Sequence, residues 1–521
     1  MKKRSKFSLS NYKILSMKMG FTVPVNLLEV LPGDTVQLST GIFMRLAPMI
    51  APVMHPVHMT VQHFYVPARI LWDDFEDFIT GGQDGMNASV PPTVTITPTQ
   101  SSLADYLGLP LGKALTVSAL PFRAYASIWN NYFRDQDLQA ELAISYDSGP
   151  DSTTSTTLQR AAWQKDYFTT ARPWPQKGPA VTIPVDMGSA GMPTLTFTGR
   201  VNADGQVVGT PHAQPFNTPG GSPGAGHLKF GGLRTGPEGY LYLQSMDGSA
   251  TADGTQITNL AGIHLQDPTV TGTIDYKPGQ AGIGSIDVSA LREAMSYQRF
   301  EEHRSLFGSR YEDYLRYLGV RPQDARLQMP EYLGGTSQTI QFSEVLQTGG
   351  DQVGQLYGHG ISAMRSRRVR RFIPEHGYLM SLLYVRPIPV YAQGVDRLWT
   401  RETKLDYWQR EMEHIGQQEV YNREVYADGT AADAEIFGFQ NRYDEYRRGV
   451  NSIAGEFRTT QDYWHMARIF ANRPTLNGDF VSSNPTDRIF QASESLSDQL
   501  YVMAQNNVVA RRLVSRNGNP I

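Results

Sequence analysis

The chain contains 521 residues, with no cysteine, 48 glycines and 32 prolines, and its formal net charge is −3. The length allows two to four domains, or one large domain with insertions. The lack of cysteine excludes a disulfide framework, a thiolate zinc site, an iron–sulfur centre and a cysteine nucleophile. No apolar run approaches the ~18–20 residues that a membrane span needs, and the lysine-rich start lacks the apolar core of a secretory signal.

The first predicted elements are two strands, at residues 33–46 and 57–66. In the first, the apolar side chains share one parity, which indicates a strand with one buried face: Val36, Leu38, Ile42, Met44 and Leu46. The second is rich in β-branched and aromatic residues and ends at Pro67. It holds two of three clustered histidines, His55, His58 and His63. Because His58 and His63 have opposite parity, they point to opposite faces, so ordinary sheet or interface positions are favoured over a metal site.

Further along the chain, residues 121–135 predict an amphipathic helix, with Pro121 in its first turn. Helices are also predicted at 311–318 and at 459–470, the latter from a Thr459-x-x-Asp462 capping box. Residues 378–385, YLMSLLYV, are continuously apolar and indicate a strand covered on both faces. Because helices do not alternate regularly with strands, the pattern favours an antiparallel sandwich or jelly roll over a doubly wound α/β fold.

Residues 178–290 differ in composition from the rest of the chain. They hold 21 of the 48 glycines, and eight acids against four basic residues. Short segments such as LTFTGRV, GYLYLQ and TGTIDY look like strands between turns. We therefore expect a β-rich surface protrusion, although such composition also suits a disordered loop.

Basic residues concentrate in three segments that contain no acid. Residues 1–28 carry six basic side chains, 365–371 carry five and 499–521 carry three, so the remainder has a net charge of −17. This segregation predicts one polyanionic partner, with Phe7 and Tyr12 available to stack on bases. A solubilising tail and a solvated arginine face are the alternative. The predicted nucleic-acid-binding residues are Lys2, Lys3, Arg4, Lys6, Lys13, Lys18, Arg365, Arg367, Arg368, Arg370, Arg371, Arg511, Arg512 and Arg516.

Motifs for enzyme chemistry are missing from the sequence. It contains no GxxxxGK[ST] phosphate loop and no GxSxG nucleophile elbow. No short motif singles out a carboxylate pair for glycoside hydrolysis. We therefore predict no catalytic residue, no metal site and no cofactor. A secreted β-rich carbohydrate-active enzyme or adhesin remains an alternative, because it would explain the glycines and aromatics, though not the basic segments.

Seven blocks of the sequence resemble the major capsid protein of the Microviridae, the small tailless single-stranded-DNA phages, and in particular their gokushovirus-like branch. Together they span most of the chain outside the glycine-rich region, and they include LPGDTVQLSTGIFMRLAPMIAPVMHPVHMTVQHFYV and FGFQNRYDEYRRGVNSIAGEFRTTQDYWHMARIF. The blocks lie at residues 31–79, 120–139, 166–181, 310–348, 374–399, 437–470 and 472–481.

The resemblance implies a viral eight-stranded antiparallel jelly roll with long loop and helical insertions. It implies sixty copies in an icosahedral shell around circular single-stranded DNA, with a small basic DNA-packaging protein, a pilot or minor virion protein and a host receptor as partners. The protein would assemble in the bacterial cytoplasm and reside in the virion. The expected parts are a basic N-terminal arm (1–30), the first part of the core (31–177), an insertion forming threefold protrusions (178–290), and the second part of the core with a C-terminal arm (291–521).

Overall fold

The computed structural model describes residues 4–82, 86–179, 181, 194–201, 207–208, 234–235, 240–242, 262–264, 269–275, 288–307, 328–346, 356–491 and 498–515. The chain divides into two compact units. The first unit contains residues 1–180 and 296–521, and the second contains residues 181–295.

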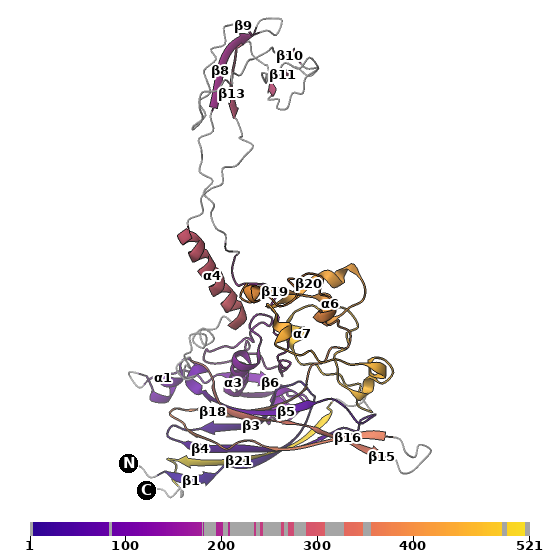
Figure 1. The fold of residues 1–521 in the computed structure, drawn as a ribbon. Helices are drawn as coiled ribbons and strands as arrows, with labels where there is room; N and C mark the ends of the chain where they lie inside the picture. Colours follow the sequence, from indigo (N-terminus) through magenta and orange to yellow (C-terminus); the bar gives the residue numbers. More distant parts are fainter. Residues whose placement is uncertain are drawn as a thin grey trace. The chain divides into compact units, whose positions relative to one another are not determined.

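Two antiparallel sheets form the centre of the first unit (Figure 1). The basic sheet, named for the side chains described below, has the order β1-β21-β4-β16-β15; β2 also pairs with β21, and β17 with β4. Its strands are β1 (Ser5–Ser8), β2 (Asn11–Met17), β4 (Thr35–Leu46), β15 (Gln341–Leu346), β16 (Leu356–Arg365), β17 (Val369–Phe372) and β21 (Leu500–Arg512). The covered sheet has the order β14-β5-β18-β3, with β3 (Val23–Val30), β5 (Val57–Pro67), β14 (Glu331–Thr339) and β18 (Gly377–Pro387).

The two sheets pack face to face because their strands alternate apolar and polar side chains. One core joins Ile42 and Met44 of β4 to Met59 and Val61 of β5, and further to Leu383 of β18. The predicted strands at 33–46, 57–66 and 378–385 are thus confirmed as β4, β5 and β18. The protein is mainly β with antiparallel sheets, as predicted.

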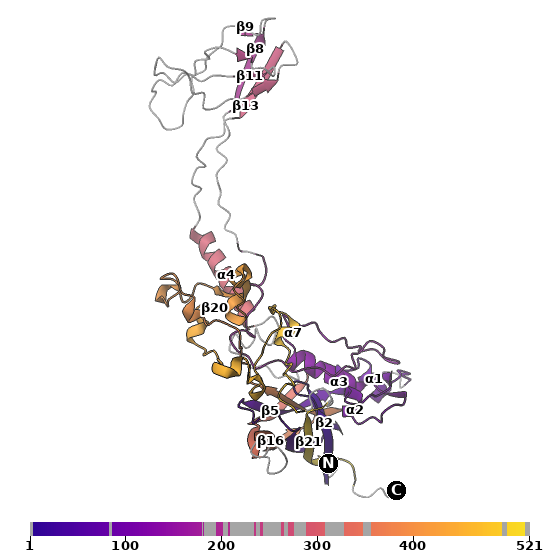
Figure 2. The same ribbon diagram turned by 90° about the vertical axis from the view of Figure 1, so that its right-hand side faces the viewer.

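The other face of the covered sheet is buried under helices. These are α1 (Phe75–Thr80), α2 (Leu103–Tyr106), α3 (Leu120–Ile128) and the π-helical turn Trp129–Phe133, together with a hairpin of β6 (Thr93–Ile96) and β7 (Leu115–Ser118). Phe64 and Leu382 of the sheet share a buried cluster with Phe122 and Tyr125 of α3, and Figure 2 shows α1, α2 and α3 on one side of the strands. The predicted helix at 121–135 is confirmed as α3 and its π-helical turn. β18 is covered on both faces, which explains its continuous apolar run.

The segment expected as a basic N-terminal arm is part of both sheets. Residues 5–17 form β1 and β2, which pair with β21, and residues 23–30 form β3, which pairs with β18. Leu15 and Met17 point into the core between the sheets, as do Val23 and Val25. Their burial is the physical reason why this segment lies in the sandwich, where it pairs with strands of its own chain.

Residues 392–491 form an irregular region beside the sheets, with β19 (Gln417–Tyr421), β20 (Ile436–Asn441), α6 (Asn422–Val425), α7 (Gly478–Val481) and short 3-10 helices. The predicted helix at 459–470 is wrong, because only 3-10 turns at Gly455–Arg458 and Asp462–Trp464 form there. Arg488 explains this outcome. Its guanidinium donates hydrogen bonds to the carbonyl oxygens of Asp462, His465 and Ala467, at 2.9–3.1 Å, and holds the segment in an irregular path.

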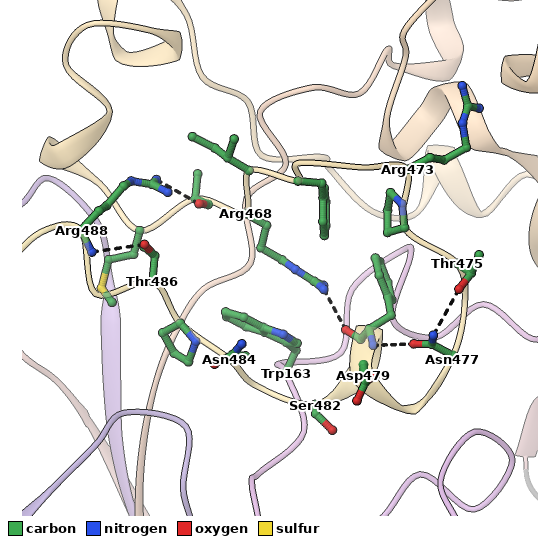
Figure 3. A pocket seen from close by; sticks show the side chains of 17 residues that line it. Trp163, Arg468, Arg473, Thr475, Asn477, Asp479, Ser482, Asn484, Thr486 and Arg488 are labelled. Atoms are coloured by element: carbon green, nitrogen blue, oxygen red, sulfur yellow. Dashed lines mark hydrogen bonds between the residues drawn. The ribbon is translucent and has the colours of Figure 1, made fainter. Parts of the chain in front are cut away.

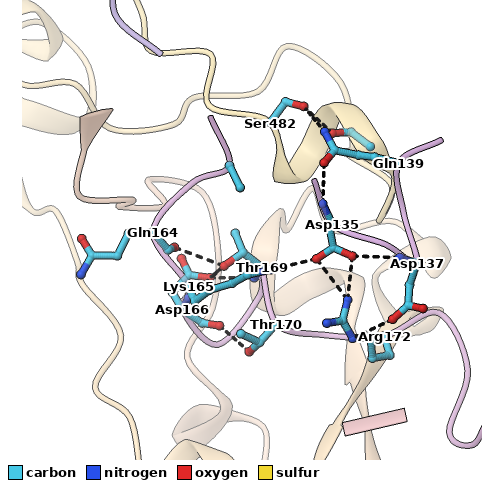
Figure 4. Close-up of polar contacts among 12 residues, drawn as sticks. Asp135, Asp137, Gln139, Gln164, Lys165, Asp166, Thr169, Thr170, Arg172 and Ser482 are labelled. Carbon is cyan, nitrogen blue, oxygen red and sulfur yellow. Dashed lines mark hydrogen bonds and ion pairs between the residues drawn. The ribbon is translucent and has the colours of Figure 1, made fainter. Parts of the chain in front are cut away.

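A network of buried charges fixes the chain that follows α3 (Figure 4). Asp135 accepts from Lys165 at 2.8 Å and from Arg172 at 3.0 Å. Asp137 lies 3.5 Å from the same Arg172. Although burial opposes the charge, Arg172 and Lys165 lower the pKa of Asp135 to about 2. The carboxylate therefore stays ionised and ties residues 135–137 to residues 165–172.

The second unit contains two small antiparallel sheets. One has the order β13-β8-β9, with β8 (Thr194–Val201), β9 (Val207–Val208) and β13 (Thr269–Asp275), and the other joins β10 (Arg234–Thr235), β11 (Tyr240–Tyr242) and β12 (Gly262–His264). The strands expected in LTFTGRV, GYLYLQ and TGTIDY correspond to β8, β11 and β13. Helix α4 (Val288–Phe307) extends across the boundary between the units. The helix predicted at 311–318 lies outside the described residues. In the described part of the chain, no helix is both long enough and apolar enough to cross a membrane.

The buried histidines predict a loss of stability in acid. His63 lies between the two sheets, where its ring nitrogens bond to the hydroxyls of Ser381 and Ser366 at 2.8 and 3.0 Å. Burial lowers the pKa of His63 to about 4, whereas an unfolded chain has a histidine pKa of about 6.5. The unfolded state therefore binds the proton first, and this contribution is complete above pH 6.5 and is lost as the pH falls towards 4.

We expect the free energy of unfolding of the wild-type subunit to fall by about 2 kcal/mol from His63 alone between pH 7.5 and pH 5. Urea unfolding at the two pH values measures this difference. A His63→Gln variant should be less stable at pH 7.5 but should show a smaller pH dependence. An unchanged pH dependence in the variant would contradict the assignment.

Candidate nucleic-acid interface

The outward face of the basic sheet gathers basic residues from both ends of the chain and from its middle. Because Val36 and Leu38 of β4 point into the core, Thr35 and Gln37 point outward. Arg511 of β21 lies opposite Thr35, and Lys6 of β1 lies opposite Arg511. We call this outward surface of β1, β2, β21, β4, β16 and β17 the basic face.

The middle basic segment, residues 365–371, adds basic side chains to this face from β16 and β17, which pair with β4 along the edge opposite to β21. Arg365 ends β16 opposite Gly41, and Arg370 of β17 lies opposite Gln37. Between these strands, Ser366 bonds to the backbone of Thr40, while Arg367 and Arg368 project from the interruption and are exposed. β16 and β17 both pair with β4, and the regular pairing is interrupted between them. An interruption of this kind changes the directions in which the local side chains point. All four arginines are exposed, and the strand register places Arg365 and Arg370 on the basic face.

The outward positions of these strands include no aspartate or glutamate in the described part of the chain. Lys6 and Arg511 face each other directly, and neither makes a side-chain hydrogen bond or ion pair with a described residue. Like charges directly opposite each other on neighbouring strands are destabilising. A polyanion bound across the face would relieve this repulsion. The closeness of the two cations does not stabilise the fold itself.

Exposed aromatic rings lie among these charges. Tyr12 of β2 is exposed opposite Gln505 of β21, and Phe372 of β17 lies opposite Thr35. The guanidinium of Arg4 lies 5.6 Å from the ring centre of Phe372, and Arg4 also donates to the carbonyl of Gly33. A basic surface with exposed rings is the arrangement that binds single strands without reading sequence, because phosphates meet cations and bases meet rings.

Three predicted binding residues are held by the protein itself. Lys13 faces inward, where its ammonium donates to the carbonyls of Pro24, at 2.9 Å, and Tyr106, and burial lowers its pKa to about 8. Arg371 forms an ion pair with Glu331. Arg512 forms an ion pair with the buried carboxylate of Asp34 at 2.9 Å. These side chains stabilise the sandwich, so they contribute little free charge to the basic face.

The remaining predicted residues fall into three groups. Lys18 is half-buried beyond the end of β2, while Arg4, Lys6, Arg365, Arg367, Arg368, Arg370 and Arg511 are exposed. Lys2, Lys3 and Arg516 lie outside the described residues. One basic residue of the face was missed: Arg45 of β4 lies opposite Tyr501 and is exposed, with its guanidinium 5.5 Å from the ring of Phe43. Its parity, shared with Gln37, was the signal that could have identified it.

Arg511 and Arg512 are sequence neighbours with opposite surroundings, and they supply a matched test. Arg511→Gln is expected to raise the free energy of unfolding by about 0.2–1 kcal/mol at low salt, because it removes the repulsion with Lys6. Arg512→Gln is expected to lower it by about 1–3 kcal/mol, because it leaves the buried Asp34 without its cation. Denaturant titration at low and high salt measures both. Equal effects of the two substitutions would contradict this account.

The three histidines are separated by the fold, and no group of side chains in the described part has the make-up of a metal site. His63 is buried between the sheets, and His58 lies on the opposite face of β5, within 3.2 Å of Thr339. His55 is buried outside the strand, with Nε2 2.7 Å from the carbonyl oxygen of Ile388. The opposite orientation of His58 and His63, expected from their parity, is confirmed.

A cavity of about 460 Å³ lies beside α7 (Figure 3). Arg468 crosses it between aromatic rings, 5.1 Å from the centre of Trp163 and 4.1 Å from that of Phe480, and donates to the Phe480 carbonyl at 2.9 Å. Asp479 is the single carboxylate among the described residues that line this cavity. A glycoside hydrolase needs two facing carboxylates, so the cavity does not fit the carbohydrate-active alternative.

The described part of the first unit is thus an antiparallel sandwich whose basic face carries no acid on its strands. Comparison with known proteins identifies the family. The pattern of the family described as "Capsid protein (F protein)" matches residues 1–520. The chain therefore belongs to this phage capsid protein family, and it is a major capsid protein of the Microviridae type.

Individual proteins that are similar to this chain are also named as capsid proteins. The chain is 34% identical to Capsid protein VP1 of Bdellovibrio phage phiMH2K, with 93% of this chain and 89% of the relative covered. It is 32% identical to Capsid protein VP1 of Chlamydia phage 1, with 93% and 90% covered. It is 31% identical to Capsid protein VP1 of Spiroplasma virus 4, with 92% and 88% covered. The predicted resemblance is confirmed, and the family points to a structural protein of the virion.

Proposed function

We propose that sixty copies of this chain form a closed icosahedral shell around circular single-stranded DNA, with the basic face turned towards the genome. The observation that carries this proposal is the convergence of Lys6, Arg365, Arg370 and Arg511, from three separate sequence segments, on one sheet face without an acid. Single-stranded DNA supplies the phosphates and the unpaired bases that such a face binds. The two face-to-face antiparallel sheets support a jelly roll as the tile of the shell.

The number of charges supports a helper in DNA packaging. Even if all fourteen predicted residues contacted phosphate, sixty copies would supply roughly 840 cations, whereas a single strand carries one phosphate per nucleotide. Lys13, Arg371 and Arg512 are held by carbonyls or acids, which lowers the available number further. A small basic packaging protein would supply part of the remaining charge. A pilot or minor virion protein completes the proposed partners, and assembly would take place in the bacterial cytoplasm.

Residues 178–290 are proposed to form protrusions at the threefold axes that contact a host receptor. The support is their glycine-rich, weakly charged composition and their separation as a second unit at residues 181–295. Replacing residues 182–287 by a short glycine–serine linker is expected to leave particles intact and to abolish adsorption to host cells. Adsorption at the wild-type level would contradict the host role.

The test of the shell and its content uses the full-length protein produced in bacteria. Negative-stain microscopy should show closed particles of one size, and nuclease treatment followed by extraction should recover protected single-stranded DNA. Uniform monomers under all assembly conditions would contradict the shell. Particles that protect no nucleic acid, even when single-stranded DNA is supplied, would contradict the assignment of the basic face.

A further inference from the structure

A second surface, outside the strands of the basic face, exposes large apolar side chains. Residues 397–415 and the neighbouring 3-10 turn Asp444–Tyr446 present seven of them. Trp399 is 78% exposed and Trp408 is 51% exposed, which is unusual for tryptophan in a folded chain. We call this surface the aromatic patch; its members are Leu398, Trp399, Leu405, Tyr407, Trp408, Ile415 and Tyr446.

The backbone beneath the patch is firmly held even though the side chains are exposed. The single hydroxyl proton of the buried Tyr443 is shared between the carbonyl oxygens of Leu405 and Tyr407, at 3.2 and 3.1 Å, and its oxygen accepts from the backbone N–H of Gln409 at 3.2 Å. Asp406 accepts from the backbone of Thr403 at 2.7 Å. A segment fixed before binding loses little conformational entropy when a partner covers it.

One cation joins the two parts of the patch. The guanidinium of Arg401 lies 5.3 Å from the ring centre of Tyr407 and 4.5 Å from that of Tyr446. This stacking connects residues 397–415 to the 444–446 turn. Tryptophan, tyrosine and arginine are the residue types that dominate the binding energy of protein–protein interfaces. The composition of the patch is thus that of an interface centre.

The charges of residues 397–415 exclude a polyanion as the partner. Four basic residues are balanced by four acids: Arg397, Arg401, Lys404 and Arg410 against Glu402, Asp406, Glu411 and Glu413. Nucleic acid and anionic lipid both require an excess of positive charge. A balanced rim around exposed aromatic rings fits another protein surface.

The area identifies the kind of protein partner. The seven side chains, four aromatic and three aliphatic, are about half exposed or more, and together they present roughly 700 Å² of mostly apolar surface, with about 150–250 Å² for a whole aromatic side chain and somewhat less for an aliphatic one. This summed area approaches the ~800 Å² that each partner buries in a stable interface. A chain of a capsid family meets copies of itself at high local concentration. We propose that the aromatic patch is a contact between copies of this chain, with Trp399 and Trp408 as its anchors; this rests on the proposed shell.

The test compares the full-length wild-type protein with the Trp399→Ser/Trp408→Ser double variant. Sedimentation velocity and negative-stain microscopy over a concentration series give the concentration at which particles form. We expect this concentration to rise about tenfold or more in the double variant, because interface anchors of this type dominate association. The melting temperature of the unassembled subunit should fall only modestly, because Trp399 is largely exposed and about half of Trp408 is exposed.

Two controls separate the patch from a general loss of apolar surface. Met54→Ser removes an apolar side chain that is also largely exposed but lies outside the patch, and it should assemble like the wild type. Trp399→Phe/Trp408→Tyr should retain most of the assembly. Particle formation by the serine variant at the wild-type concentration would overturn the proposal, as would an equal defect in Met54→Ser.

If a different protein covered the aromatic patch, the same experiment would give a different result. Serine-variant particles that form normally but no longer retain a second virion protein would assign the patch to that protein and overturn the contact between copies. Failure of the wild-type protein itself to assemble would overturn the proposed shell together with this inference. A defect confined to the serine variant supports the inference and leaves the shell in place.

Discussion

Arg123→Met is expected to lower the free energy of unfolding by about 3–5 kcal/mol. Arg123 lies in α3 with its side chain fully buried, and its Nε is 2.9 Å from the equally buried carboxylate of Asp151. It also donates to the carbonyls of Leu71 and Asp147, both at 3.0 Å. Removing the guanidinium leaves a carboxylate and two carbonyls buried without this donor. Denaturant unfolding of the subunit measures the loss.

An exposed ion pair provides the control for this prediction. Arg69 and Glu375 have the same type of contact at 3.0 Å, but about a third of each side chain is accessible to solvent. Arg69→Met should therefore cost less than about 1 kcal/mol. The double variant Arg123→Met/Asp151→Asn should recover part of the stability, because it removes the uncompensated buried charge. Similar losses for Arg123→Met and Arg69→Met would contradict the role assigned to burial.

Reversing two charges of the basic face is expected to remove much of its affinity for single-stranded DNA. Arg365→Glu/Arg370→Glu changes two exposed side chains on β16 and β17 that have no ion pair with a described residue. Each phosphate contact on a single strand contributes about 0.7 to the slope of log K against log salt. Two lost contacts should reduce the slope by about 1.4 and the affinity roughly 25-fold at 0.1 M salt. Fluorescence anisotropy with labelled single strands over a salt series measures both.

A control with the same change of net charge tests whether the position of the charges matters. Lys113→Glu/Arg458→Glu alters two exposed basic residues outside the basic face. It should change the affinity much less, because only the long-range potential of the protein is altered. In particles, the Arg365→Glu/Arg370→Glu variant should assemble but protect less DNA. An equal loss in the two variants would show that net charge, and not the basic face, governs binding.

Local patterns predicted the central strands and the helix after Pro121. The alternation in β4 gives the face of each side chain directly, because successive residues of a strand point to opposite sides. The same signal failed at 459–470, where Arg488, more than fifteen residues away, bonds to the carbonyls of the expected helix. A pattern read over a few neighbouring residues contains no information about a hydrogen-bond donor that lies so far along the chain. Nor does any local signal distinguish Arg123, buried with Asp151, from an arginine on the solvated side of a helix.

Composition, side-chain period and ordered blocks of residues were enough to establish the segregation of charge, the antiparallel β class and the family. Which cations are free depends instead on how distant strands pair. β1 pairs with β21 across some five hundred residues, and this pairing brings Lys6 beside Arg511. In the same sheet, Lys13 points inward and donates to the carbonyl of Pro24, and Arg512 forms an ion pair with Asp34. Side-chain parity and long-range strand pairing together decide which basic residues are exposed for binding and which are held inside the protein. The pairing partner of a strand is not encoded in its local sequence.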